Sequence, residues 1–140
     1  MISGMTSTPI WPQVPADPLQ AARRVQFIEH NGRRVLFINY ADCDIPMLKA
    51  VADEMHRVIS KEPAHSVLTL NDVTGTSFDS ESVAVLKSRV AANAPYVRKA
   101  AVIGISGLQR LIYEAVQRFS RRSIPLFNSR DEALNWLVKD

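Results

Sequence analysis

The sequence predicts a single α/β domain with a mixed, mostly parallel five-stranded sheet flanked by four helices. Two observations carry this prediction. Short apolar runs with the length of buried strands alternate with segments whose apolar residues recur at helical spacing. The two β-prone runs within residues 25–40 are separated only by Asn31 and Gly32, which is a strong hairpin signal. We therefore expect the element order ββαβαβαβα.

The first twenty residues differ from the rest of the chain. Pro9, Pro12, Pro15 and Pro18 recur every third residue around Trp11, without helix or strand periodicity. We assign residues 1–20 to an extended or disordered arm and residues 21–140 to the domain. A proline-rich ligand for an aromatic groove is the alternative for the arm.

The first helix after the hairpin is expected to begin at Asp44 and Pro46 and to end before Pro63. Its buried residues share one stripe: Leu48, Val51, Ala52, Met55 and Ile59. A third strand follows at residues 66–70. A polar loop then leads to a helix that Pro95 closes, with an apolar stripe of Val83, Leu86, Val90 and Ala94.

The fourth strand, residues 100–105, leads through Ser106 and Gly107 into a strongly amphipathic helix. Ser106 and Gln109 have the spacing of a capping box. The helix should bury one stripe: Leu108, Leu111, Ile112, Ala115, Val116 and Phe119. A fifth strand at residues 124–127 should lie at a sheet edge, because Pro125 lacks a ladder donor. The last helix starts at the Ser129–Glu132 capping box and buries Ala133, Leu134, Trp136 and Leu137.

Composition excludes several classes of function. The formal charge is only +3, and the arginines Arg110, Arg118, Arg121 and Arg122 are typical of a solvated helix end, so we expect no nucleic-acid partner. Cys43 is the single cysteine, which excludes an intrachain disulfide and a cysteine-based zinc site and favours a reducing compartment. No apolar stretch approaches the ~20 residues of a membrane helix. The sequence predicts no integral membrane segment and a cytoplasmic location.

No catalytic residue is predicted. Ser106 resembles the serine of a G-x-S-x-G elbow, but Leu108 stands where the second glycine is needed, and every histidine precedes the serine. Asp72 and Asp79 flank a loop at the carboxyl end of a strand, where open α/β sheets bind ligands. They could form a metal or acid–base pair, but capping of turns and helices is favoured. We expect no cofactor and no metal.

Three segments resemble one family: VLTLNDVTGTSFDSESVAVL, AAVIGISGLQRLIYEAVQRF and LFNSRDEALNWL. They are similar to the SpoIIAA-like family of small bacterial proteins, which is related to the STAS domains of anti-sigma-factor antagonists and, more distantly, to CRAL-TRIO lipid-binding domains. The resemblance covers roughly residues 25–140. It implies a mixed five-stranded sheet flanked by helices.

The resemblance also implies a phosphorylation site. In the antagonists a loop ends in Asp-Ser before a helix, and a partner kinase phosphorylates that serine to break a protein complex. The matching residues are Asp79 and Ser80, followed here by Glu81 and Ser82 where the antagonists have a second serine and a glycine. Glu81 would repel an incoming phosphate. The alternative is that Asp79 or Ser80 caps the helix.

The resulting hypothesis is a non-catalytic regulatory module that binds a protein partner and is switched by phosphorylation of Ser80. Its expected partner surface comprises Asp72, Thr74, Gly75, Asp79, Ser106 and Gly107. The alternative is a carrier or sensor of a small apolar or lipid-like ligand held between helices and sheet, which needs a cavity of several hundred Å³. The first hairpin or the strand at Ile124 could also pair with a second copy to form a homodimer.

Overall fold

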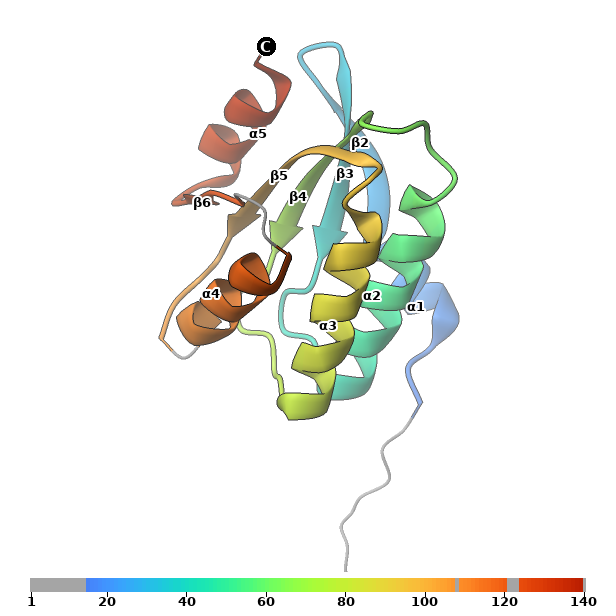
Figure 1. Cartoon of the computed structure of the whole chain (residues 1–140), viewed down its shortest axis with the longest axis vertical. Coiled ribbons are helices and arrows are strands. Elements are labelled where there is room, and N and C mark those ends of the chain that lie inside the picture. The colour runs from blue at the N-terminus through green and yellow to red at the C-terminus, as the bar shows by residue number, and fades with distance from the viewer. Residues whose placement is uncertain (1–14, 108, 121–123, 140) are drawn as a thin grey trace, which may run out of the picture.

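The structure, a computed structural model, describes residues 15–107, 109–120 and 124–139. It contains a five-stranded sheet with helices on both faces (Figure 1). Its elements in chain order are α1 (Pro18–Arg23), β2 (Val25–His30), β3 (Arg33–Asn39), α2 (Ile45–Ile59), β4 (Val67–Asp72), α3 (Ser80–Asn93), β5 (Val97–Ile103), α4 (Gln109–Ser120), β6 (Leu126–Phe127) and α5 (Arg130–Val138). The predicted α/β class and mixed five-stranded sheet are confirmed.

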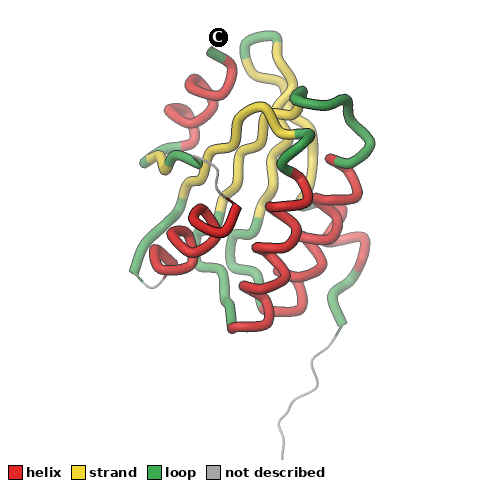
Figure 2. Tube along the Cα trace, in the orientation of Figure 1, coloured by secondary structure: helices red, strands yellow, loops and turns green. Residues whose placement is uncertain are grey.

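The strands lie in the order β2-β3-β4-β5-β6. The pair β2 and β3 is antiparallel, whereas each later neighbour is parallel to the one before it. Asn31 and Gly32 both have positive φ, as the predicted hairpin turn requires. Each helical crossover connects a strand to its immediate parallel neighbour, and all of the crossovers proceed in the same direction along the sheet. The helices α2, α3 and α4 therefore lie on one face, while α5 lies on the other (Figures 1 and 2).

The face covered by α5 is closely packed. Its core consists of side chains at most 8% exposed: Val35, Leu68, Leu70, Ala101, Ile103, Ala133, Leu134 and Leu137. The rings of Phe127 and Trp136 pack beside this core with centroids 5.5 Å apart. The Ser129 hydroxyl accepts from the Glu132 backbone N–H, so the predicted start of α5 is confirmed.

On the other face α2 is buried as the sequence predicts. Asp44 caps the helix by accepting from the Met47 backbone N–H at 2.9 Å. All five residues of the predicted stripe are buried: Leu48, Val51, Ala52, Met55 and Ile59. The inner side of α2 therefore packs directly against the sheet and forms part of the core on this face.

The start of the folded domain differs from the prediction. The described residues form five helices rather than four, because α1 begins at Pro18, inside the segment expected to be an extended arm. Asp17 caps α1 by accepting from the Leu19 N–H, and Pro18 suits the first helical position. Residues 15–17 belong to no helix or strand, and residues 1–14 of the predicted arm lie outside the described residues.

The stripes predicted to be buried in α3 and α4 are a larger correction. Val83, Leu86 and Val90 of α3 are only half-buried. In α4 Leu111 is 65% exposed and Phe119 55% exposed, whereas Val116 is buried. The side chains of Leu108, Arg121 and Arg122 lie outside the described residues. The physical reason is that α4 packs mainly against α3 and stands away from the sheet.

The sheet edges are β2 and β6. The last strand is shorter than predicted, and Pro125 lies just before it, where its carbonyl accepts from the Val102 N–H at 3.0 Å. Pro125 therefore occupies an edge position that needs no donor, as predicted. The strand expected at residues 100–105 spans Val97–Ile103, so Ile105 belongs to the following loop.

Candidate ligand-binding pocket

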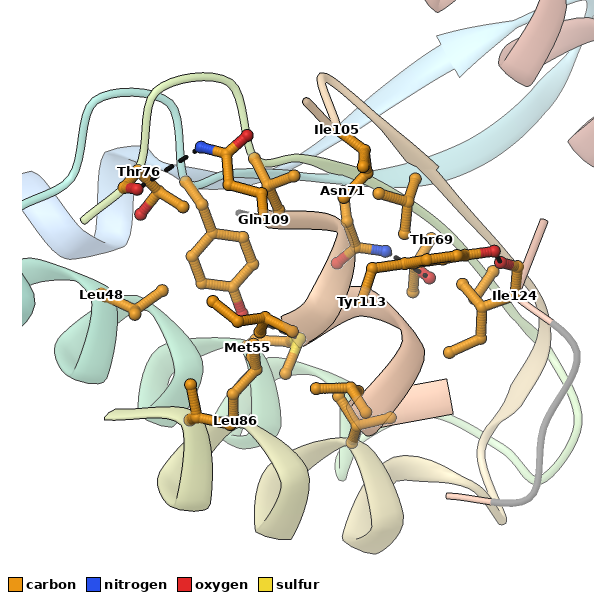
Figure 3. Close-up of a pocket in the computed structure, with 18 of the residues that line it drawn as sticks. Leu48, Met55, Thr69, Asn71, Thr76, Leu86, Ile105, Gln109, Tyr113 and Ile124 are labelled. Carbon is orange, nitrogen blue, oxygen red and sulfur yellow. Dashed lines mark hydrogen bonds between the residues drawn. The ribbon is translucent and has the colours of Figure 1, made fainter. Parts of the chain in front are cut away.

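A cavity of about 110 Å³ lies between α2, α3, α4 and the sheet. Figure 3 shows Leu48, Met55 and Leu86 on its helical side, across from Thr69 and Asn71 of β4. The lining side chains come from α2, α3, α4, β4, β5 and the loops that adjoin these elements: Tyr40, Leu48, Met55, Ile59, Thr69, Asn71, Val73, Thr76, Phe78, Val83, Leu86, Val90, Asn93, Val97, Ala100, Val102, Ile105, Gln109, Ile112, Tyr113, Val116 and Ile124. None of them is charged.

The alternation of side chains along β5 explains where the cavity forms. Ala100 and Val102 line the cavity, whereas Ala101 and Ile103 belong to the core under α5. Ala100 has a small side chain, and α4 does not pack closely enough against the sheet to occupy the space next to it. The cavity therefore forms where the short side chain of Ala100 faces α4, which makes few contacts with the sheet.

Two polar residues of β4 face this apolar cavity. Asn71 Nδ2 donates to the Ala101 carbonyl at 3.1 Å and to Thr69 Oγ1 at 3.4 Å. Thr69 itself is only 3% exposed. Neither residue is among the predicted site residues, although the sequence contains a signal for both. A central parallel strand covered on both faces is normally apolar throughout, and Thr69 and Asn71 interrupt VLTLND at alternate positions on one face.

Two further polar groups in the lining already have partners. The Tyr40 hydroxyl donates to the Met55 thioether at 3.6 Å, and burial raises the pKa of Tyr40 well above its ordinary value. This phenol therefore stays neutral. Asn93 Oδ1 lies 2.6 Å from His56 Nδ1.

Polar contacts from Gln109 and Tyr113, in its first half, hold α4 in place. The Gln109 side chain accepts from the Ser106 N–H at 3.2 Å and donates to the Thr76 carbonyl at 3.5 Å. One turn further along the helix, the Tyr113 hydroxyl donates to the Ile124 carbonyl at 2.5 Å (Figure 3). Partial burial raises the pKa of Tyr113. The first half of α4 is thus attached by polar contacts, and the same part of the helix covers the cavity through Gln109, Ile112, Tyr113 and Val116.

The loops predicted to form a partner surface meet at the carboxyl end of the sheet. The Asp72 carboxylate accepts from the Thr74 N–H at 3.0 Å and from the Thr74 hydroxyl at 2.6 Å. Gly104 packs so closely on this turn that a Cβ there would lie 2.2 Å from Thr74 Oγ1. Gly75, with φ +65°, packs against Asp42 in the same way. The turn-capping role of Asp72 is confirmed.

The predicted phosphorylation motif lies at the start of α3. Asp79 accepts from the Ser82 N–H at 2.7 Å, and Ser82 Oγ accepts from the Asp79 N–H, so the two form a capping box. These bonds hold the pKa of Asp79 below its ordinary value. Ser80 is exposed beside them, and Glu81 pairs with Lys49 at 3.1 Å. The cap is therefore Asp79 and not Ser80.

The structure brings the predicted site residues into two groups. Asp72, Thr74 and Gly75 form one turn, and the neighbouring Ser106 is linked to it through Gln109 and Thr76. The bond from Gln109 to the Ser106 N–H is one of the two bonds of the predicted capping box. Gly107 is exposed, with φ +54°, at the entry to α4. Asp79 and Ser80 form the second group at the start of α3.

The described residues hold neither a metal-binding cluster nor a membrane-spanning helix. Within residues 15–107, 109–120 and 124–139, no group of three or more histidine, cysteine, aspartate or glutamate side chains is arranged to hold a metal ion. In the same residues no helix combines the length and apolar character needed to cross a bilayer.

No family model matches this chain, and no curated protein or solved structure matches it either. The resemblance to the SpoIIAA-like family stays a prediction.

Proposed function

We propose that the protein is a non-catalytic carrier or sensor that binds one small, largely apolar molecule in the cavity under α4. The observation that carries this proposal is a cavity of about 110 Å³ whose lining is apolar apart from a few hydrogen-bonding groups. Such a lining is typical of small-molecule sites. A closely packed interaction module would instead be filled to ordinary interior density.

The size of the cavity limits the ligand. An apolar cavity of ~150 Å³ holds one benzene molecule, and pockets for larger ligands span ~300–1,000 Å³. The volume of about 110 Å³ is nearer the first value. A ligand of one ring or a short alkyl chain therefore fits better than the lipid-like molecule that the sequence analysis considered.

The incomplete packing of α4 also supports a ligand. The inner residues Ile112 and Ala115 are only half-buried, although they belong to the apolar stripe of the helix. A ligand in the cavity would supply apolar contacts to α3, α4 and the sheet at once. Binding should therefore stabilise the folded protein.

Native mass spectrometry of protein purified from the cells that make it tests the proposal. We expect an added mass that is present under native conditions and lost on denaturation. The matched control is Ala100→Leu, which narrows the cavity at its floor and should carry less of the added mass. The proposal fails if the wild-type protein carries no added mass or if Ala100→Leu carries as much of it.

A second candidate function is the phosphorylation-controlled interaction module, and one observation favours it. Ser80 is exposed at the first position of α3 and is not needed as the cap, since Asp79 caps with Ser82. The charge of Glu81 is partly compensated by Lys49 at 3.1 Å. A phosphate on Ser80 would also be favoured by the dipole at the start of the helix. Phosphopeptide mapping of the same purified protein tests this candidate, and a modification confined to other serines would contradict it.

A further inference from the structure

We infer that the ligand of the cavity is neutral and carries one hydroxyl or N–H group, which donates a hydrogen bond to Asn71 Oδ1. This inference rests on the proposed function, because it names the ligand class of the same cavity. It goes further by assigning a specificity-determining residue that the shape of the cavity alone does not identify.

The neutrality follows from the lining. None of the lining side chains carries a charge at neutral pH, and the phenol of Tyr40 is held neutral by its burial. A charged group inside an apolar cavity without a counter-charge loses its hydration with little compensation. The part of the ligand that enters the cavity should therefore be uncharged.

The orientation of the Asn71 amide follows from its partners. A backbone carbonyl can only accept, so the group that faces the Ala101 carbonyl at 3.1 Å must be the NH₂ of Asn71. Its second proton is directed to Thr69 Oγ1 at 3.4 Å. Both amide protons are thus used, which leaves the Oδ1 atom on the side away from Thr69 (Figure 3).

The surroundings of Asn71 provide no protein donor to this oxygen. Its neighbours across the sheet are Ile38 on β3 and Val102 on β5, both of them buried and apolar. Among the described residues no hydrogen bond reaches Asn71 Oδ1. Asn71 is only half-buried, and no fully buried side-chain polar atom of the described residues lacks a partner, so this oxygen is accessible. Its hydrogen bond therefore comes from water or from a ligand in the cavity.

An acceptor in this position selects for ligands that can donate. A purely apolar ligand would remove water from Asn71 Oδ1 without replacing its hydrogen bond, which is unfavourable. A ligand of the same shape with a hydroxyl group restores that bond. Small aromatic or alicyclic alcohols, phenols and N–H heterocycles have the required chemistry.

Titration of the purified protein with three single-ring probes tests the inference. Phenol carries a donor, toluene has a methyl group in its place, and benzoate adds a charge. We compare wild type with Asn71→Leu, which removes the acceptor, and with Ala100→Leu, which narrows the cavity but keeps Asn71. Isothermal calorimetry gives the Kd values, and circular dichroism checks that each variant is folded.

We expect the ratio of the toluene Kd to the phenol Kd to fall roughly three- to tenfold in Asn71→Leu, the change typical of one net hydrogen bond. In Ala100→Leu both Kd values should rise by similar factors. Benzoate should not bind measurably. An unchanged ratio in Asn71→Leu overturns the inference, as does benzoate binding as tight as that of phenol.

The outcomes separate this inference from the proposed function. If neither toluene nor phenol binds to wild type, the cavity is not a ligand site and both fail. If toluene binds and the ratio of the toluene Kd to the phenol Kd is the same in wild type and in Asn71→Leu, only the inference fails. Should Asn71→Leu not fold, ¹³C NMR of the wild-type Asn71 side-chain carbonyl replaces it. Phenol should then shift this resonance more than toluene does, and equal shifts overturn the inference.

Discussion

Ala100 and Ala101 are neighbours on β5, yet they lie in opposite environments. Ala101 is fully buried in the core under α5, whereas Ala100 lines the cavity under α4. One face of the sheet is thus filled by a nine-residue helix, and the other keeps free space beneath three longer ones. The identity of the residue does not decide how tightly a face is packed; the distance of the covering helix does.

The helices α2 and α4 show the same difference on one face. Both have a clear apolar stripe in the sequence, but only that of α2 is fully buried. The helix α2 is held by packing of this stripe, whereas α4 is held by polar bonds from Gln109 and Tyr113. An amphipathic pattern therefore identifies the inner side of a helix without fixing how closely that side approaches the sheet.

The largest expected effect comes from truncating one leucine in each of these helices. Leu48→Ala in α2 should lower the free energy of unfolding by about 2–5 kcal/mol, because Leu48 is only 3% exposed. Leu111→Ala in α4 should change it by less than about 0.5 kcal/mol, because Leu111 is 65% exposed. Urea denaturation measures both values. Similar losses in the two variants would show that α4 is packed like α2.

The two alanines of β5 provide the next test. Ala101→Leu should destabilise the protein by about 1–3 kcal/mol, because the face under α5 has no room for a larger side chain. Ala100→Leu should be neutral or stabilise it by about 0.5–2 kcal/mol, because the side chain enters the cavity. The same denaturation experiment compares them. Equal destabilisation by both substitutions would argue against free space under α4.

The polar attachment of α4 should contribute less. Tyr113→Phe removes the hydroxyl whose single proton is shared between the Ile124 carbonyl at 2.5 Å and Gln117 Oε1 at 3.1 Å, and should cost about 1 kcal/mol. Hydrogen exchange should also become faster in α4 than in α2. Tyr96→Phe is the control, since the Tyr96 hydroxyl makes no hydrogen bond within the described residues. If amide hydrogen exchange in Tyr113→Phe changed equally in α4 and α2, Tyr113 would not be what holds α4 in place.

The smallest effect concerns the cap of α3. Bonds from Ser82 lower the pKa of Asp79 in the folded protein, so the ionised form is the stabilising one. This stabilisation is complete above the ordinary carboxyl pKa of 3.8 and is lost as the pH falls below it. Asp79→Asn should remove this part of the acid dependence of the denaturation midpoint, because an amide caps at every pH. An unchanged pH profile would exclude Asp79 as its source.

Much of the fold was predictable because local signals agree with the tertiary structure. The turn at Asn31 and Gly32, the cap at Asp44 and the stripe of α2 all occur where the sequence predicts them. The capping roles of Asp72 and Asp79 follow from the preference of short carboxylates for such positions.

The cavity was not predictable, because it depends on how far α4 stands from the sheet. Periodicity marks Leu111 and Ile112 as apolar-stripe residues whether or not a neighbour covers them. Asn71 and Thr69 could have been found, since polar residues at alternate positions of a buried strand are unusual. The orientation of the Asn71 amide required the position of the Ala101 carbonyl, which only the tertiary structure provides.

Methyl NMR during titration with toluene shows whether a ligand binds under α4, since it reports on both faces of the sheet in one experiment. The account predicts shifts of the Val83, Leu86 and Val102 methyl resonances, which line the cavity, and an increase in melting temperature. The methyl groups of Leu68 and Leu134 on the α5 face should not move. Shifts of equal size on both faces, or no shifts at saturating toluene, would contradict the existence of a ligand site under α4.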